Sequence, residues 1–211
     1  MILSGAPMHT PRHVVRRMAL ACALVLVAFP CRAEQPSGQG IKVPYALAWG
    51  DSVDKVREML NAVKARETAL SQRSPGRFVL EAEGLAVGDQ LLKKSLFTFR
   101  EGSLVEVELQ YGDPSWDGEK TLDFFDRTRR RIGERYGTGS LIVNKVRERP
   151  SGEKVPQDVT YTLIIYQWTQ PTAALELDYY GVEGVEQALC LVSLHYNCLL
   201  YTSPSPRDRT R

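Results

Sequence analysis

The sequence predicts an α+β domain in which two helices pack on one face of an antiparallel sheet. Three observations lead to this fold class. Two segments carry apolar residues at helical spacing, seven have the alternation or apolar enrichment of strands, and short turns between successive strands favour antiparallel neighbours. The order is helix, three strands, helix, four strands, which fits two tandem α-β-β-β units at residues 43–112 and 113–197.

The N-terminal segment has the three-part layout of a secretion signal. Arg16 and Arg17 lie in a basic stretch, an apolar run follows at residues 18–29, and Ala33 ends a Cys-x-Ala cleavage pattern. The run is too short for a membrane-spanning helix, which needs about 20 apolar residues. We therefore expect residues 1–33 to be a cleaved signal peptide and the protein to be periplasmic or extracellular.

Two further expectations concern the ends of the chain. A lipid anchor at Cys31 is the weaker alternative, because Pro30 and not a small residue precedes it. Residues 34–42 are rich in turn residues and are expected to form a flexible lead-in.

The C-terminal string from Cys198 to Asp208 continues no pattern before it. It resembles the translated sequence of a transposase mosaic-end sequencing adapter. The alternative is a disordered basic tail rich in Ser, Pro and Arg. We therefore expect one α+β domain at residues 43–197 and an artefactual or disordered tail at residues 198–211.

The first helix is predicted to begin at Asp51 or Ser52, whose side chains can accept hydrogen bonds from free backbone N–H groups. Its apolar face contains five residues at helical spacing: Val53, Val56, Met59, Leu60 and Val63. The turn residues Ser74-Pro75-Gly76 are expected to end it. Strands are then predicted at residues 77–82, 91–100 and 104–111, the last two joined through the Glu101-Gly102 turn.

A second helix is predicted at residues 118–136, ending at Gly137. Strands follow at four further ranges, namely residues 141–147, 159–168, 173–180 and 189–196. With both helices on one face of the sheet, the opposite face is open to solvent. Glu106 and Glu108 alternate with apolar residues in their strand, so we expect them on that open face.

Two short patterns resemble known envelope domains. Gly50-x-Ser52-x-x-x-Val56-x-x-x-Leu60, followed by Phe97-x-Phe99-x-x-Gly102-x-Leu104, resembles the helix and hairpin of the outer-membrane assembly lipoproteins of the SmpA/OmlA type and, more broadly, of the β-lactamase inhibitor protein. The resemblance covers about a third of residues 34–197. It implies helices on a short antiparallel sheet and binding of other proteins rather than catalysis. The chain departs from it at Asn61-Ala62-Val63, where those domains have Gly-x-Pro.

Charge and reactive residue types exclude several functions. The chain has 27 Lys and Arg against 25 Asp and Glu, but the two ends hold seven of the bases and one of the acids, so residues 34–197 have a net charge of −4. That charge disfavours nucleic acid as a partner. This segment has one cysteine, Cys190, and one histidine, His195. A nucleophilic triad and a zinc site are therefore not expected, and with no nucleotide fingerprint we expect no cofactor or metal.

The remaining reactive or charged residues have structural interpretations. Cys190 lies in an apolar run and is interpreted as a small buried residue. His195 is interpreted as a surface or edge histidine of a strand. The basic run at residues 127–131, with Arg135, could contact phosphate. However, acidic residues four positions away can pair with it along the helix, so a solvated helix face is favoured.

Two groups of residues remain as candidate sites. An open sheet face rich in aromatic residues would suit a protein surface, and four such residues are candidates for binding: Tyr166, Trp168, Tyr179 and Tyr180. The alternative is the carboxylate pair Glu106 and Glu108, since glycoside cleavage needs two carboxyl groups.

We therefore expect an exported, non-enzymatic envelope or periplasmic module for protein binding or structure, with another envelope or extracellular protein as its partner. The alternative function is a carboxylate-dependent hydrolase of cell-wall or extracellular glycan.

Overall fold

The computed structural model describes residues 40–149, 159–184 and 189–201. The predicted signal peptide, residues 34–39 of the predicted lead-in and residues 202–211 of the predicted tail lie outside these ranges. The elements in chain order are α1 (Val53–Ala62), β1 (Arg66–Ser74), β2 (Arg77–Glu83), β3 (Ala86–Val87), β4 (Gln90–Leu91), β5 (Lys94–Arg100), β6 (Ser103–Tyr111), α2 (Gly118–Tyr136), β7 (Ser140–Arg149), β8 (Val159–Thr169), β9 (Ala173–Glu183), β10 (Leu189–Cys198) and the 3-10 helix η1 (Leu199–Tyr201).

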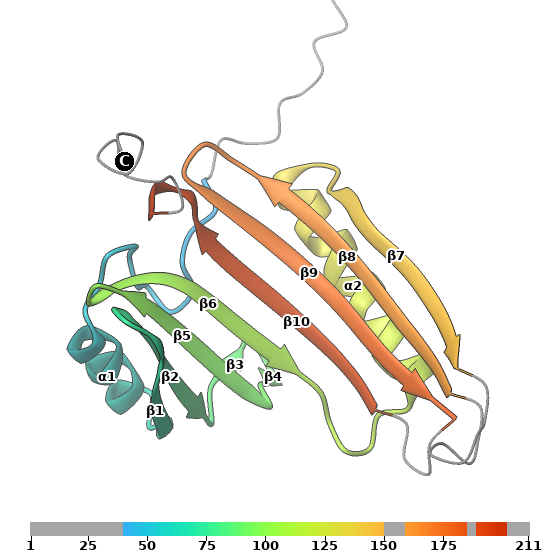
Figure 1. The fold of residues 1–211 in the computed structure, drawn as a ribbon, viewed down its shortest axis with the longest axis horizontal. Coiled ribbons are helices and arrows are strands. Elements are labelled where there is room, and N and C mark those ends of the chain that lie inside the picture. Colours follow the sequence, from blue (N-terminus) through green and yellow to red (C-terminus); the bar gives the residue numbers. More distant parts are fainter. Residues whose placement is uncertain (1–39, 150–158, 185–188, 202–211) are drawn as a thin grey trace, which may run out of the picture. The chain divides into compact units, whose positions relative to one another are not determined.

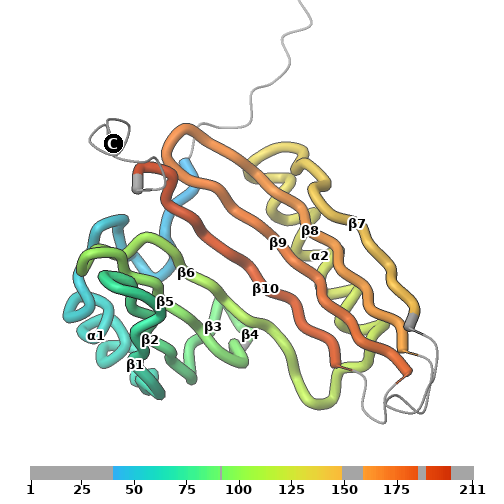
Figure 2. Tube along the Cα trace, in the orientation of Figure 1, coloured from blue at the N-terminus to red at the C-terminus, as the bar shows by residue number. Residues whose placement is uncertain are grey.

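The main sheet has eight strands in the order β1-β2-β5-β6-β10-β9-β8-β7, and every neighbouring pair is antiparallel. This confirms the predicted α+β class. Each half is a helix followed by four main-sheet strands in a meander, and the halves join where β6 pairs with β10 (Figures 1 and 2). The tandem units are therefore α-β-β-β-β, with the β3–β4 hairpin inserted in the first.

The predicted first helix is too long. Helix α1 ends at Ala62, after which Lys64 has a left-handed φ of 58°. The Lys64 N–H donates to the Asn61 carbonyl at 3.1 Å and the Ala65 N–H to the Leu60 carbonyl at 2.9 Å, the Schellman arrangement that ends a helix. The residues that follow form β1, an edge strand.

One core joins the two helices to one face of the main sheet. Helix α1 contributes Val56 and Leu60, and α2 contributes Phe125 and Ile132. The sheet contributes inward-facing residues from both halves, among them Phe97, Val107, Leu109, Leu175, Leu177 and Leu194. Helix α2 packs against β9 and β10 and is drawn behind the sheet in Figure 1. Both helices thus cover the same face, as predicted, and the opposite face is called the open face below.

Two predicted boundaries need correction. Ile41, expected in a flexible lead-in, is buried in the core, and its backbone N–H donates to Gln170 Oε1 at 2.6 Å. Cys198, expected to begin a tail, is the last residue of β10, is buried and pairs with Ala173. Among the described residues, no helix is long and apolar enough to cross a membrane.

Candidate functional site

The centre of the open face carries a row of mostly polar side chains. Residues opposite one another on paired strands point to the same face of a sheet. The row crosses six strands in register: Glu81, Leu96, Glu108, His195, Glu176 and Gln167. Glu106 lies two residues before Glu108 on β6, and Asp178 two residues after Glu176 on β9, so both share this face. Glu106 and Glu108 thus lie on the face predicted for them.

His195 lies at the centre of this row and not at an edge of the sheet. It belongs to β10, which is hydrogen-bonded to β6 on one side and β9 on the other. Its Nε2 lies 3.5 Å from Asp178 Oδ2 and 4.0 Å from Glu108 Oε1, and its Nδ1 lies 3.9 Å from Glu106 Oε1. The imidazole is only 21% exposed. These four residues are called the His195 cluster.

The surroundings shift the pKa values of the His195 cluster in different directions. Burial lowers the pKa of His195, but the interaction with Glu106 and the charges of Glu108 and Asp178 outweigh it, so the net shift is upward. The pKa of Glu106 is lowered, first by His195 and also by the charge of Arg77, against the effect of burial.

The pKa of Asp178 is shifted in the opposite direction to that of Glu106. Burial raises the pKa of Asp178 to about 6, although the charge of His195 acts against this. Its Oδ1 is buried and has no hydrogen-bond partner among the described residues. Compared with an exposed carboxyl group, the fold therefore stabilises the protonated form of Asp178 and the ionised form of Glu106.

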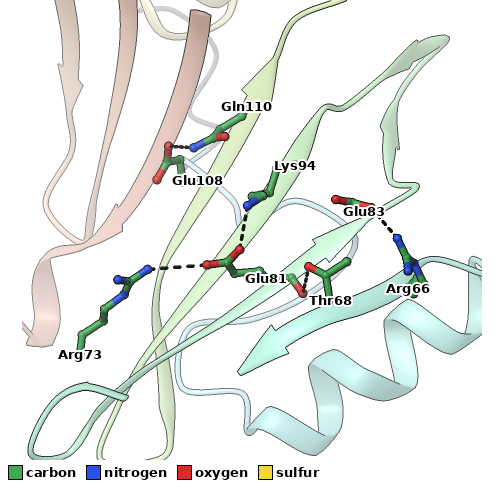
Figure 3. A network of polar contacts seen from close by, with 8 residues as sticks. All are labelled: Arg66, Thr68, Arg73, Glu81, Glu83, Lys94, Glu108 and Gln110. Atoms are coloured by element: carbon green, nitrogen blue, oxygen red, sulfur yellow. Dashed lines mark hydrogen bonds and ion pairs between the residues drawn. The ribbon is translucent and has the colours of Figure 1, made fainter. Parts of the chain in front are cut away.

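Ion pairs and amide hydrogen bonds continue the cluster toward β2. Glu81 lies 2.8 Å from Lys94 and 3.6 Å from Arg73, and Figure 3 shows it between the two. Gln110 Nε2 donates to Glu108 Oε1 at 2.7 Å, a contact that Figure 3 also shows. On the same face, Arg77 Nη2 lies 3.0 Å from Glu106 Oε2.

A cleft of about 360 Å³ lies on the open face beside the His195 cluster. Glu106 and Glu108 both line it, together with Arg73, Arg77 and Thr98. The predicted carboxylate pair therefore meets in one concave surface. Because Glu106 is tied to Arg77 and its pKa is lowered, it is unsuited to the part of a general acid, which must hold a proton.

An apolar patch adjoins the cluster on the open face. By register, Ile165 lies next to Asp178, and Leu163, Tyr180 and Leu191 form the next row. Tyr180 is 41% exposed and the other three are partly exposed. These four residues are called the apolar patch. An accessible patch of this kind beside charged groups is typical of a surface that binds another protein.

Three of the four predicted binding aromatics do not lie on the open face. Trp168 and Tyr179 are each only 4% exposed, and with Tyr166 they pack on the helix-covered face. The indole Nε1 of Trp168 donates to the Gly137 carbonyl at 2.8 Å, which ties β8 to the end of α2. Tyr166 and Trp168 alternate along β8 and so share a face, but helix packing determines which face is covered.

His195, Glu176 and Asp178 are not among the site residues predicted from the sequence. The signal for the two acids was present, because Glu176 and Asp178 alternate with Leu175 and Leu177, the pattern of a strand with one buried face. The pairing of β10 with both β6 and β9 could not be read from that pattern. It is this pairing that surrounds His195 with carboxyl groups.

Within the described ranges, no group of three or more His, Cys, Asp or Glu side chains is arranged to hold a metal ion. Comparison with protein families, with curated proteins and with solved structures finds no match to this chain. The fold and site thus define a class only: an α+β protein with one helix-covered sheet face and one open face that carries charged and apolar side chains.

Proposed function

We propose that this chain is an exported, non-enzymatic module that binds another protein through the open face of its sheet. The observation that supports this proposal is the contiguity of the apolar patch with the His195 cluster. A partner of matching chemistry would place an exposed apolar side chain on Tyr180 and Leu163 and a lysine or arginine near Glu108 and Glu176.

Two carboxylates in the row that contains His195 are suited to a basic group on the partner. Glu108 accepts a hydrogen bond from Gln110, and Glu176 accepts one from Gln167 Nε2 at 2.8 Å. Both donors are neutral amides, which orient a carboxylate without cancelling its charge. An incoming cation would therefore meet carboxylates that are already positioned.

A photo-crosslinking experiment tests the binding face. A photoreactive phenylalanine analogue is placed at Tyr180 on the open face, or at Leu122, which is 39% exposed on α2, as the matched control. We expect one crosslinked protein from position 180 and none from position 122. The isolated partner should then bind the Tyr180→Ala and Glu108→Gln variants at least tenfold more weakly. Equal crosslinking from both positions, or unchanged affinity of both variants, would contradict the proposal.

The proposed location depends on the signal-like residues 1–33, and the partner would then be another envelope or extracellular protein. When the full chain is produced in a bacterium, the mature protein should be recovered from the periplasm or medium and begin at Glu34. Protein sequencing of the purified N-terminus measures this. Cytoplasmic recovery with residues 1–33 still attached would remove the exported part of the proposal.

One observation favours a second candidate function, a hydrolase of cell-wall or extracellular glycan. Glu106 and Glu108 line the same cleft on the open face. If they perform the reaction, Glu106→Gln and Glu108→Gln should each abolish release of reducing sugar from peptidoglycan or a soluble glycan. The variant Glu58→Gln, on α1, is the matched control. Absence of turnover by the unmodified protein, or turnover that survives both substitutions, would exclude this pair.

A further inference from the structure

A second cleft lies on the helix-covered side of the sheet, away from the open face. It has a volume of about 370 Å³, within the range of small-molecule sites. One wall is α2 and the other is the β3–β4 hairpin, represented by Val87, Asp89 and Gln90. Side chains of β6, β9 and β10 form the base between them.

The wall formed by α2 is cationic. Arg127, Arg131 and Arg135 are spaced four residues apart, so they lie along one side of the helix, and all three line the cleft. The other two arginines of the basic run have different positions. Arg129 lies over the ring of Tyr166, and Arg130 donates to the backbone carbonyl of Asp126.

Arg127 and Arg131 face little negative charge in this cleft. Asp89 is the only acidic residue among the described residues that line the cleft. Arg127 lies 3.1 Å from Asp123, but both side chains are more than half exposed, so water weakens the pair and the guanidinium can exchange partners. The cleft is thus locally positive although residues 34–197 have a net negative charge.

The base of the cleft is apolar. Leu175 and Leu194 come from the sheet, Ile132 from α2 and Tyr111 from β6, and each is buried. Phe124 adds a partly buried ring that lies 5.0 Å, between centroids, from both Tyr111 and Trp116. An apolar base beside a row of guanidinium groups matches a ligand with an apolar body and an anionic head.

We propose that this cleft binds an amphipathic organic carboxylate of the medium-chain fatty-acid type. The carboxylate would accept hydrogen bonds from Arg127 and Arg131, and the hydrocarbon chain would lie on Ile132, Leu175 and Leu194. Arginine suits this part because its guanidinium can pair with a carboxylate through two parallel hydrogen bonds. The inference is independent of the proposed protein-binding function, because the two surfaces lie on opposite faces of the sheet.

Calorimetric titration of the full chain with decanoate, below its micelle concentration, tests the proposal. We expect one site per chain. Decanol, which has the same chain without the charge, and acetate, which has the charge without the chain, should each bind at least tenfold more weakly. Equal binding of decanol and decanoate would overturn the assigned role of the arginines, and equal binding of acetate would overturn that of the apolar base.

Three variants locate the site. Arg127→Ala and Arg131→Ala should each weaken decanoate binding at least fivefold, whereas Arg130→Ala on the same helix should not. Leu194→Phe should reduce binding by filling the base. Circular dichroism confirms that each variant is folded, and quenching of Trp116 fluorescence gives a second readout near Phe124. Decanoate binding that is unchanged in both arginine variants, or no binding to the unmodified chain, would overturn the proposal, whatever the crosslinking at Tyr180 shows.

Discussion

At the scale of single residues, the His195 cluster combines carboxyl groups with opposite preferences for a proton. Asp178 has a pKa of about 6 in the folded protein, whereas an unfolded chain gives about 3.9. Between these pH values the folded state binds more protons than the unfolded state. The contribution of Asp178 to the free energy of unfolding therefore falls as the pH rises through that window.

The variant Asp178→Asn removes this dependence. Relative to the unmodified protein, it should gain stability between pH 4 and pH 8, reaching about 1–2 kcal/mol at the upper end, because no buried carboxylate has to be ionised there. Urea unfolding at the two pH values measures the difference. A stability difference that is the same at pH 4 and pH 8 would contradict the assignment of a raised pKa to Asp178.

Glu106 is the matched control, because its pKa is shifted in the opposite direction to that of Asp178. Its pKa is lowered in the fold, so its contribution is present above the unfolded value of about 4.3 and is lost as the pH falls. Glu106→Gln should therefore destabilise the protein at pH 8 and less so near pH 3.

His195 has a raised pKa, so its contribution to the free energy of unfolding is present below about pH 6.5 and is lost as the pH rises. The loss of stability caused by His195→Gln should therefore be larger at pH 5 than at pH 8.

The packing of Trp168 gives another residue-scale prediction. A Cβ added at Gly139 would lie 2.5 Å from Trp168 Cε2, too close without a shift of the buried indole. Gly139→Ala should cost about 1–3 kcal/mol, as overpacking does. Gly133→Ala, in α2 with no atom within 4 Å of the new Cβ, should be stabilising by about 0.5–1 kcal/mol. Thermal and urea unfolding measure both, and equal effects would contradict the placement of Trp168.

At the scale of elements, the end of α1 can be tested directly. Lys64 occupies the left-handed position after the helix, where glycine is favoured because it has no Cβ. Lys64→Gly should therefore stabilise the protein by about 1 kcal/mol. Lys55→Gly, inside α1, should destabilise it by about the same amount. Urea unfolding distinguishes them, and destabilisation by Lys64→Gly would indicate that the helix continues beyond Ala62.

For some elements the local sequence pattern is enough to predict the structure, and for others it is not. Residues 118–136 have a strong apolar face, a capping Asp117 and a terminating Gly137, and α2 has the predicted bounds. Residues 66–74 contain helix-favouring Arg, Glu, Ala, Leu and Gln, and as an edge strand β1 has no fully buried residue. These residues form a strand because they pair with β2, and a local sequence pattern cannot predict that pairing.

At the scale of the whole molecule, the candidate site also depends on tertiary contacts that local sequence patterns do not reveal. The alternation in β8 puts Tyr166 and Trp168 on the same face of the sheet. Which face of β8 is covered depends on the position of α2, so three aromatic residues predicted for the open face lie in the core or pack against it. The face on which Glu106 and Glu108 lie was predicted correctly, because their neighbours Val107 and Leu109 are strongly apolar and leave only one face for the acids.

The two halves of the fold share one core, so they should unfold together. Leu177 is fully buried in the second half, and its replacement by alanine should cost about 2–5 kcal/mol. Because β6 pairs with β10 and the core extends across that junction, Leu177→Ala should accelerate hydrogen exchange equally in β2 and β5 of the first half and in β8 and β9 of the second. Leu70→Ala, 45% exposed on β1, is the control and should change little. Loss of protection confined to β8 and β9 would show that the halves are separate folding units despite their common sheet.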